Sequence, residues 1–230
     1  MPVINDEEFG KITIRRSARS RQVRLRVGPD GLLRASLPVY APLFLVKRLI
    51  KTSRDQLRDM MDQASTHITF VDGMRIGKSH VLRVYETKGK LQVKRGGQHI
   101  NVLLPLGLTL DDPEVVREVR TVMQNALRVE SKSYLPKRLA FIAAEYDYSY
   151  SQVRFSHASG RWGSCNSEGV ISLNIALMKL PFELIDYVLI HELAHTRFLN
   201  HSEEFWEQVA IADPEYKKHR KALKLETPSI

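Results

Sequence analysis

The stretch that says most about the fold is His191-Glu192-Leu193-Ala194-His195, which is followed by His201. Two histidines four residues apart lie on the same side of an α-helix, and the glutamate after the first one lies close to that side. This spacing is typical of helices that hold Zn²⁺ and direct a carboxylate at a water molecule on the metal. The stretch predicts metal-assisted hydrolysis, with Glu192 as the general base.

The residues before this motif favour a helix. Pro181 suits a first turn, where its missing N–H is not needed, and Glu183 and Asp186 suit the positive end of the helix dipole. Apolar residues recur at helical spacing at Leu184, Val188 and Leu189. We therefore expect a mostly buried helix that carries the motif and continues for about one more turn after His195.

A third metal ligand is needed, because catalytic zinc usually takes three protein ligands and keeps one position open. His201 is the favoured candidate, since it lies on the turn after the helix and can approach the metal. Glu203 and Glu204 are the alternatives. With Ser202 as an N-cap, however, these two glutamates are also what the first turn of an ordinary helix contains. The sequence thus predicts Zn²⁺ as the cofactor, held by His201 together with the two motif histidines.

Several stretches together resemble the YgjP-like metallopeptidase family, minimal zincins related to the WLM and SprT-like proteases. They are residues 161–165 (RWGSC), 173–174 (LN), 185–188 (IDYV), 191–195 (HELAH), 200–202 (NHS) and 205–206 (FW). The resemblance covers most of the chain and implies that His191, His195 and His201 are zinc ligands and that Glu192 is catalytic. Residues 157–160 depart from the family pattern, because more basic residues are expected there.

The resemblance implies a zinc metallopeptidase that acts on a peptide or protein. A metal-dependent nucleoside-triphosphate pyrophosphohydrolase is the alternative, since some YgjP-like members are associated with that activity. A nucleic-acid-associated protease is a further interpretation, because WLM and SprT-like proteases act on DNA-crosslinked proteins. A non-enzymatic module with structural zinc is disfavoured, because structural sites usually have four protein ligands and no use for a general base.

Four residues are candidates for contact with the substrate. Arg161 and Ser164 lie in a glycine-containing turn that could line the cleft, although Arg161 could equally pin that turn to a backbone carbonyl. Asn174 could hold either the substrate backbone or an edge strand. In minimal zincins the strand before the metal helix often borders the substrate groove, so residues 170–175 are expected to bind an extended peptide by strand addition. Tyr216 is a candidate for contact with the oxyanion, as a tyrosine is in some zincins.

The formal net charge of +9 is unevenly distributed. Residues 1–112 contain 20 Lys+Arg and 11 Asp+Glu, whereas residues 113–230 contain 15 of each. Val23, Leu25 and Val27 alternate with arginines, which predicts a half-buried strand with a basic, solvent-facing ridge. The ridge is interpreted as a surface for phosphate or nucleic acid, or as an ordinary solvated strand face. Its arginines are Arg15, Arg16, Arg19, Arg21, Arg24 and Arg26.

Periodicity predicts an α+β chain in two parts. Residues 1–110 form a basic, β-rich region with one helix over residues 42–64, and hairpin turns are expected at residues 88–89 and 96–97. Residues 111–230 form a minimal, gluzincin-like zincin domain with helices packed on a small sheet. A long helix is expected from residue 113, ended or bent at Pro136 and followed by a second over residues 137–146. No internal repeat is recognised.

The remaining features concern the compartment. The chain has a single cysteine, so an intrachain disulfide is ruled out and a reducing compartment is favoured. No basic and apolar leader begins the sequence, and no apolar stretch approaches the roughly 20 residues that span a bilayer. The sequence therefore predicts a cytoplasmic protein without a membrane partner.

Cys165 is interpreted as a small apolar group rather than a nucleophile or ligand.

Overall fold

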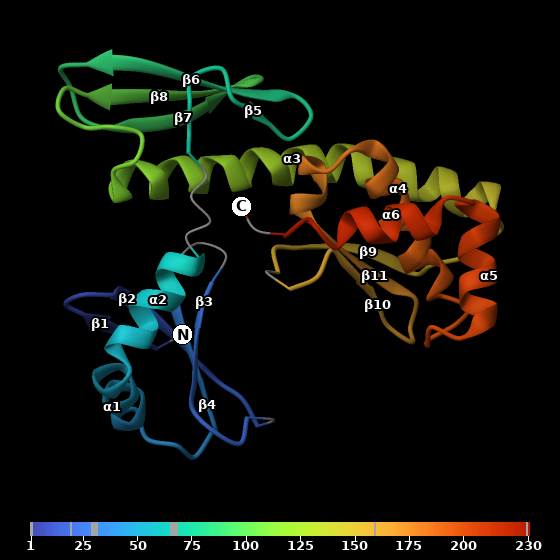
Figure 1. Ribbon diagram of the computed structural model, residues 1–230, viewed down its shortest axis with the longest axis horizontal. Coiled ribbons are helices and arrows are strands. Elements are labelled where there is room, and N and C mark those ends of the chain that lie inside the picture. Colours follow the sequence, from blue (N-terminus) through green and yellow to red (C-terminus); the bar gives the residue numbers. More distant parts are fainter. Residues whose placement is uncertain (1, 19, 29–31, 65–68, 159, 229) are drawn as a thin grey trace. The chain divides into compact units, whose positions relative to one another are not determined.

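The computed structural model describes residues 2–18, 20–28, 32–64, 69–158, 160–228 and 230 (Figure 1). It confirms the α+β class. The chain divides into two compact units, Met1–Ile68 and Thr69–Ile230. The boundary expected near residue 110 lies inside the second unit, because helix α3 (Pro113–Glu145) packs against the sheet that precedes it. The assignment of separate functions to the two predicted parts stays a prediction.

The first unit contains a four-stranded sheet in the order β1-β2-β4-β3. Its strands are β1 (Val3–Asp6), β2 (Gly10–Arg16), β3 (Arg24–Val27) and β4 (Leu33–Leu37). β2 and β4 are parallel, whereas β1/β2 and β3/β4 are antiparallel pairs. Alternate side chains of β2 and β4, such as Ile12, Ile14 and Leu33, are fully buried in one core. The opposite face therefore carries the polar residues of the same strands.

Two helices complete the core of this unit (Figure 1). They are α1 (Phe44–Thr52) and α2 (Arg54–Ala64), and Val46, Ile50 and Leu57 supply their buried side chains. The single helix predicted over residues 42–64 is wrong at Ser53. There the backbone takes φ −120° and ψ 25°, outside the helical region, so the chain changes direction between the two helices.

The second unit begins with another four-stranded sheet, in the order β5-β6-β8-β7. Its strands are β5 (Arg75–Ile76), β6 (His80–Thr87), β7 (Gln92–Gly96) and β8 (His99–Pro105). Two antiparallel pairs again flank a parallel central pair, β6/β8, so this unit repeats the topology of the first sheet. The turn predicted at residues 96–97 joins β7 and β8. The hairpin predicted at residues 88–89 is wrong, because β6 pairs with β8 and not with β7.

Helix α3 is continuous over 33 residues, so the predicted interruption at Pro136 is wrong. A proline removes one backbone hydrogen bond and crowds the preceding turn. Leu135 and Leu139 are both fully buried on either side of it. Tertiary packing therefore holds the helix together across Pro136.

Glu130 of α3 anchors the turn before β6. Its carboxylate accepts hydrogen bonds from the backbone N–H groups of Lys78 (2.7 Å) and Ser79 (2.9 Å), from Ser79 Oγ (2.7 Å) and from His80 Nδ1 (2.6 Å). Burial acts to raise the pKa of Glu130, but these hydrogen bonds outweigh it and the pKa is lowered. Gly77 has φ +64°, and a Cβ there would collide with the Glu130 carboxylate. The turn therefore requires glycine for its conformation and for its close approach.

The remaining elements surround the metal motif. Strands β9 (Gln152–Ser156), β10 (Gly163–Cys165) and β11 (Val170–Asn174) form a sheet in the order β10-β11-β9. A 3₁₀ helix, η1 (Ile175–Lys179), precedes helices α4 (Phe182–Ala194), α5 (Glu203–Ala212) and α6 (Tyr216–Leu223). Among the helices in the described ranges, none combines the length and apolarity that a membrane span requires.

Helix α4 is the predicted metal helix, and most of its residues are buried. It ends at Ala194, so the further turn expected after His195 is wrong. Thr196 and Arg197 instead donate their backbone N–H groups to the carbonyls of Leu193 and Ala194, which are i→i−3 bonds, and one further i→i−4 bond joins the Phe198 N–H to the Ala194 carbonyl. This tightening ends the α-helix at the motif and makes His195 its C-cap residue.

Candidate metal centre

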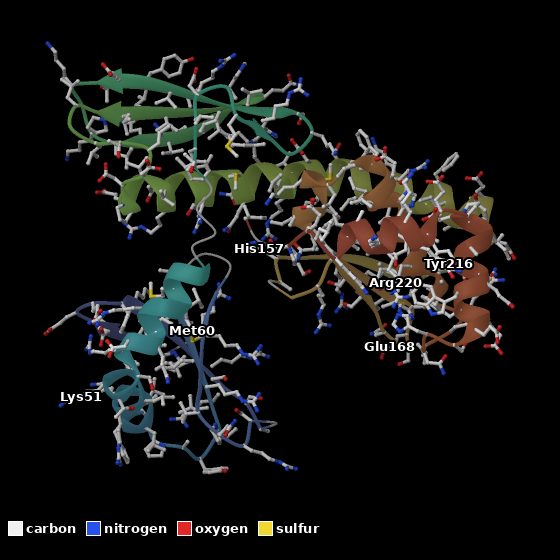
Figure 2. The ribbon with its side chains drawn as sticks, in the orientation of Figure 1. Lys51, Met60, His157, Glu168, Tyr216 and Arg220 are labelled. Atoms are coloured by element: carbon white, nitrogen blue, oxygen red, sulfur yellow. The ribbon has the colours of Figure 1, made fainter. Side chains whose placement is uncertain are left out.

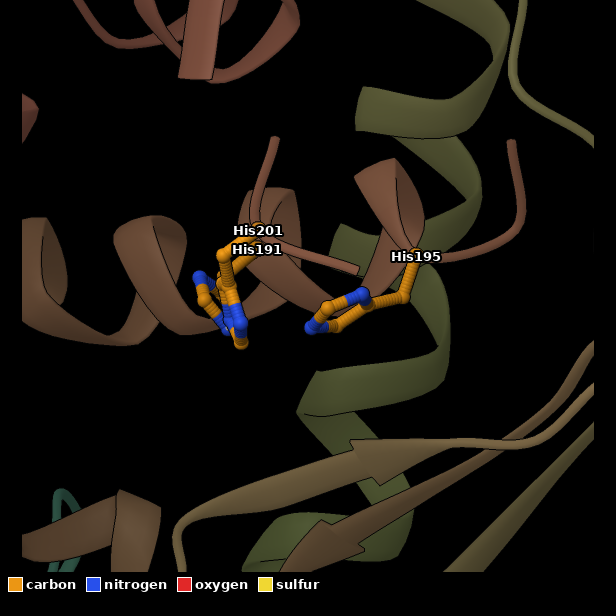
Figure 3. A group of neighbouring side chains, drawn as sticks. All are labelled: His191, His195 and His201. Carbon is orange, nitrogen blue, oxygen red and sulfur yellow. The ribbon is translucent and has the colours of Figure 1, made fainter. Parts of the chain in front are cut away.

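The three predicted ligands come together in space. His191 lies in the last turn of α4, His195 is its C-cap, and His201 lies between α4 and α5; their rings converge in Figure 3. One donor atom from each lies within 4.8 Å of the others. Among the described residues, Glu203 and Glu204 are exposed on α5 and do not belong to this group.

The nitrogen spacing fits a shared metal ion. Nε2 of His191 and Nε2 of His201 are 3.2 Å apart. Two nitrogens on one tetrahedral metal, with bonds of about 2.0–2.1 Å, are separated by roughly 3.4 Å. The backbone carbonyl of Phe198 accepts a hydrogen bond from Nδ1 of His195 at 2.9 Å. This bond fixes the tautomer and orientation of the His195 ring and leaves its Nε2 as a donor to a metal.

Protonation also favours metal binding. Burial lowers the pKa of His191 to about 3, and the charges of His195, His201 and Arg220 act in the same direction. Burial, His195 and Arg220 also lower the pKa of His201. Both imidazoles are therefore neutral at physiological pH, which is the form that ligates metals. Neutral imidazoles whose nitrogens converge in this way form a donor set suited to a divalent transition metal.

Aromatic side chains of α5 form the wall behind the histidines. Phe205 is fully buried, and its ring centroid lies 5.0, 4.6 and 4.8 Å from those of His191, His195 and His201. Trp206 stacks on His201 with a centroid distance of 5.5 Å and an interplanar angle of 23°. These two aromatic side chains therefore pack against the turn that carries His201.

Glu192 is only 5% exposed, and its Oε2 has no hydrogen-bond partner within the described part of the chain. Burial raises the pKa of Glu192 to about 8, although the charge of Arg161 opposes this shift. A carboxylate with a pKa near neutrality can both accept and return a proton at physiological pH. The environment of Glu192 thus suits a general base.

Gly163 of β10 lies against this carboxylate. A Cβ at position 163 would lie 2.5 Å from Oε1 of Glu192 and 2.7 Å from its Cγ. Gly163 has no left-handed φ, so the close approach and not the backbone conformation requires glycine here. Sequence reasoning missed this role, although Gly163 belongs to the RWGSC stretch that carries the family resemblance.

The candidate substrate residues have different environments. Arg161 is exposed, and its charge acts on Glu192. Ser164 is the middle residue of β10, so its side chain lies on the face opposite Gly163 and Cys165. Burial, followed by the charge of Glu192, raises the pKa of the Cys165 thiol, which agrees with an unreactive cysteine.

Asn174, predicted to hold either the substrate backbone or an edge strand, bonds to the backbone of its own chain. It is fully buried, and its amide donates to the carbonyls of Ala158 (2.7 Å) and Arg161 (2.9 Å). Its Oδ1 accepts from the backbone N–H of Ala176 (3.0 Å) at the start of η1. Strand β11, which contains residues 170–174, is paired on both sides and has no free edge for a peptide. The edge strand of this sheet next to α4 is β10.

The predicted arginine ridge is only partly free for other contacts. Arg16 hydrogen-bonds the backbone carbonyls of Val39 and Ala41 and so holds the loop after β4. Arg19 lies outside the described residues. The other arginines of the ridge are exposed on β2, β3 and the segment between them: Arg15, Arg21, Arg24 and Arg26.

A helix-borne His-Glu-x-x-His motif, a third histidine on the following turn and a buried carboxylate together define a metal-dependent hydrolase. The chain belongs to the YgjP-like family: the family model described as "YgjP-like, metallopeptidase domain" matches residues 21–226. The protein is therefore a metallopeptidase, a hydrolase that acts on peptides or proteins and uses a metal ion, and the family resemblance is confirmed.

One solved structure is similar to part of the chain. The crystal structure of the metallopeptidase zymogen of Pyrococcus abyssi abylysin is 27% identical, with a TM-score of 0.36. The similarity covers 39% of this chain and 91% of that chain. No curated protein matches the sequence.

Proposed function

We propose that the protein is a zinc metallopeptidase in which His191, His195 and His201 hold the metal and Glu192 is the general base. The observation that carries this proposal is the convergence of three histidine donor atoms within 4.8 Å beside a buried carboxylate. A donor set of imidazoles alone suits Zn²⁺. Three protein ligands leave one position open for water and substrate, as catalytic zinc requires.

The metal would supply Lewis acidity, polarising the peptide carbonyl and lowering the pKa of water at the open position. Glu192 accepts the proton of the attacking water at its carboxylate and returns it to the leaving amine. The Phe205 wall keeps the three rings in place and restricts water behind them. The charge of Arg161 acts on Glu192, so its guanidinium would add positive charge near the negative charge that develops on the substrate.

The free edge of β10 offers a path for an extended substrate. β10 pairs with β11 on one side only, and Gly163 places its backbone directly against Glu192. A peptide that added to this edge as a further strand would therefore pass the catalytic carboxylate. The path replaces the one expected along residues 170–175.

The test compares metal content and turnover. Wild type, Glu192→Gln and His201→Ala are analysed for bound metal by mass spectrometry and incubated with casein, a peptide library and a panel of nucleoside triphosphates. We expect Glu192→Gln to keep zinc and lose peptide cleavage, and His201→Ala to lose zinc. Glu203→Gln and Glu204→Gln are controls that should keep both properties. Substantial cleavage by Glu192→Gln would refute the assignment of the general base.

The nucleotide alternative is tested by the same panel. The family match supports a peptidase and gives no support to nucleoside-triphosphate hydrolysis. The contrary outcome is that wild type releases phosphate or pyrophosphate without cleaving peptides, while Glu192→Gln releases neither. That result would show that the site hydrolyses nucleotides and not peptides.

We also propose, from a separate observation, that the outer face of the first sheet binds the phosphates of nucleic acid. Arg15 and Arg24 both lie in register with Ser36, and Arg26 lies directly opposite Arg34. Arg15, Arg24 and Arg26 are all exposed, and a cluster of exposed cations on one sheet attracts the phosphates of a polyanion. The affinity for labelled DNA should fall steeply as the salt concentration rises. It should also be lower in the double variant Arg24→Glu/Arg26→Glu than in wild type. Absent or salt-insensitive binding would contradict the proposal.

A further inference from the structure

A row of cations lies on one side of helix α6. Lys217, Arg220, Lys221 and Lys224 line an open hollow of about 230 Å³. Arg220, Lys221 and Lys224 follow Lys217 by three, four and seven residues, so all four lie on one helical face over a length of roughly 10 Å. None of the described residues that line this hollow is acidic. Within the described chain none of the four forms an ion pair, whereas the neighbouring Lys218 pairs with Glu215 at 2.8 Å.

The row begins next to the metal ligands. The Arg220 guanidinium lies over the ring of Trp206, 4.4 Å from its centroid, and Trp206 stacks on the metal-ligand candidate His201. Tyr216 stacks on the same indole at 5.4 Å, with an interplanar angle of 17°. Tyr216 and Arg220 are both labelled on α6 in Figure 2. One aromatic stack therefore connects the cationic face of α6 with the candidate metal centre.

The helix dipole does not explain this arrangement. Cations are favourable near a helix C-terminus, which accounts for Arg220, Lys221 and Lys224. Lys217 lies in the first turn, where a cation is unfavourable, and the acidic N-cap residue Glu215 pairs with Lys218 and not with Lys217. Because these like charges share one helical face and form no ion pair within the described chain, the face attracts an anion.

We propose that this face of α6 is a subsite for acidic side chains of the peptide substrate. The inference rests on the proposed function and adds a preference for aspartate or glutamate near the scissile bond. An extended peptide advances about 3.3 Å per residue, so the row can contact about three substrate residues. Two successive side chains on the same face of that peptide, about 7 Å apart, would each meet a cation of the row.

The test measures a specificity ratio. Two fluorogenic peptides differ only in aspartate or asparagine residues near the cleaved bond, and the ratio of their kcat/KM values is compared between wild type and Lys221→Glu/Lys224→Glu. Each exposed ion pair has a modest energy, so exchanging two attractions for two repulsions should lower the ratio about tenfold. The matched control is Lys132→Glu/Lys137→Glu, two exposed lysines of α3 with the same change in net charge. An unchanged ratio in the α6 variant, or an equal fall in the control, would overturn the proposal.

A binding measurement separates this inference from the proposed function. Zinc-loaded Glu192→Gln protein is titrated with a labelled aspartate-rich peptide and with its asparagine counterpart, and fluorescence anisotropy is recorded. Tighter binding of the aspartate peptide, lost in Lys221→Glu/Lys224→Glu, supports the subsite even where wild type cleaves neither peptide. Peptide cleavage without any preference for the acidic peptide leaves the peptidase intact and refutes the subsite. Binding of inorganic triphosphate, with no binding of the aspartate peptide, would assign the cations to phosphate instead.

Discussion

Replacing Gly163 with alanine tests whether the close approach of β10 positions the carboxylate of Glu192, the proposed general base. The new Cβ would lie 2.5, 2.7 and 2.8 Å from Oε1, Cγ and Cδ of Glu192. Ordinary contact begins near 3.4 Å, so the carboxylate or the strand must move by about 0.9 Å. A misplacement of about 1 Å can reduce a catalysed rate on the order of 100-fold. We therefore expect kcat/KM to fall by about that factor, while the three histidines retain the metal.

The assay is peptide cleavage by the metal-loaded variant, with metal content and Tm measured on the same sample. Overpacking costs roughly 1–3 kcal/mol, so activity is measured well below the lowered Tm. Gly160→Ala is the matched control, because it adds the same methyl group in the turn just before β10, where its Cβ would meet nothing within 4 Å. If Gly163→Ala kept full metal content and cleaved peptides as fast as Gly160→Ala, the proposed positioning of Glu192 by β10 would be refuted.

The remaining predictions concern stability and the wall of the metal site. Gly77→Ala should lower Tm more than Gly97→Ala, because φ is positive at both positions but a Cβ meets Glu130 only at Gly77. Similar Tm values for the two variants would contradict the anchoring role of that carboxylate. The pKa of Glu130 is lowered from 4.5, so its contribution to stability is present above pH 4.5 and is lost as pH falls through the folded-state pKa. Urea unfolding of wild type and Glu130→Gln should therefore converge in acid, and a constant difference between them would refute this linkage. Phe205→Ala should cost about 3–5 kcal/mol and weaken zinc binding, since the ring contacts all three histidines. Unchanged zinc affinity in a folded Phe205→Ala protein would show that the wall does not orient the ligands.

The ligand set could be predicted from sequence because its geometry is local. Residues four apart on a helix share a face whatever the rest of the fold does, and six further residues suffice for a turn that returns His201 to the metal. Each of these predictions depends on spacing within one short stretch.

Predictions that depended on distant contacts failed. Packing of buried leucines holds α3 continuous across Pro136, and rules that consider only neighbouring residues cannot predict such packing. The repeated strand order of the two sheets rests on the parallel pairs β2/β4 and β6/β8, which join strands that are not adjacent in sequence. Asn174 looked available for a substrate because its partners, the carbonyls of Ala158 and Arg161, come from another segment. The role of Gly163 depends likewise on the approach of α4.

The two buried glutamates of the second unit show how the fold separates a structural carboxylate from a reactive one. Glu130 and Glu192 are 7% and 5% exposed, so desolvation acts on both. Glu130 receives four hydrogen bonds from residues 78–80, and its pKa falls below the ordinary value. Glu192 has an oxygen without a partner in the described chain, and its pKa rises to about 8. Buried carboxylates normally find donors, so the missing partner of Glu192 is a cost in stability that the proposed proton-transfer role would explain.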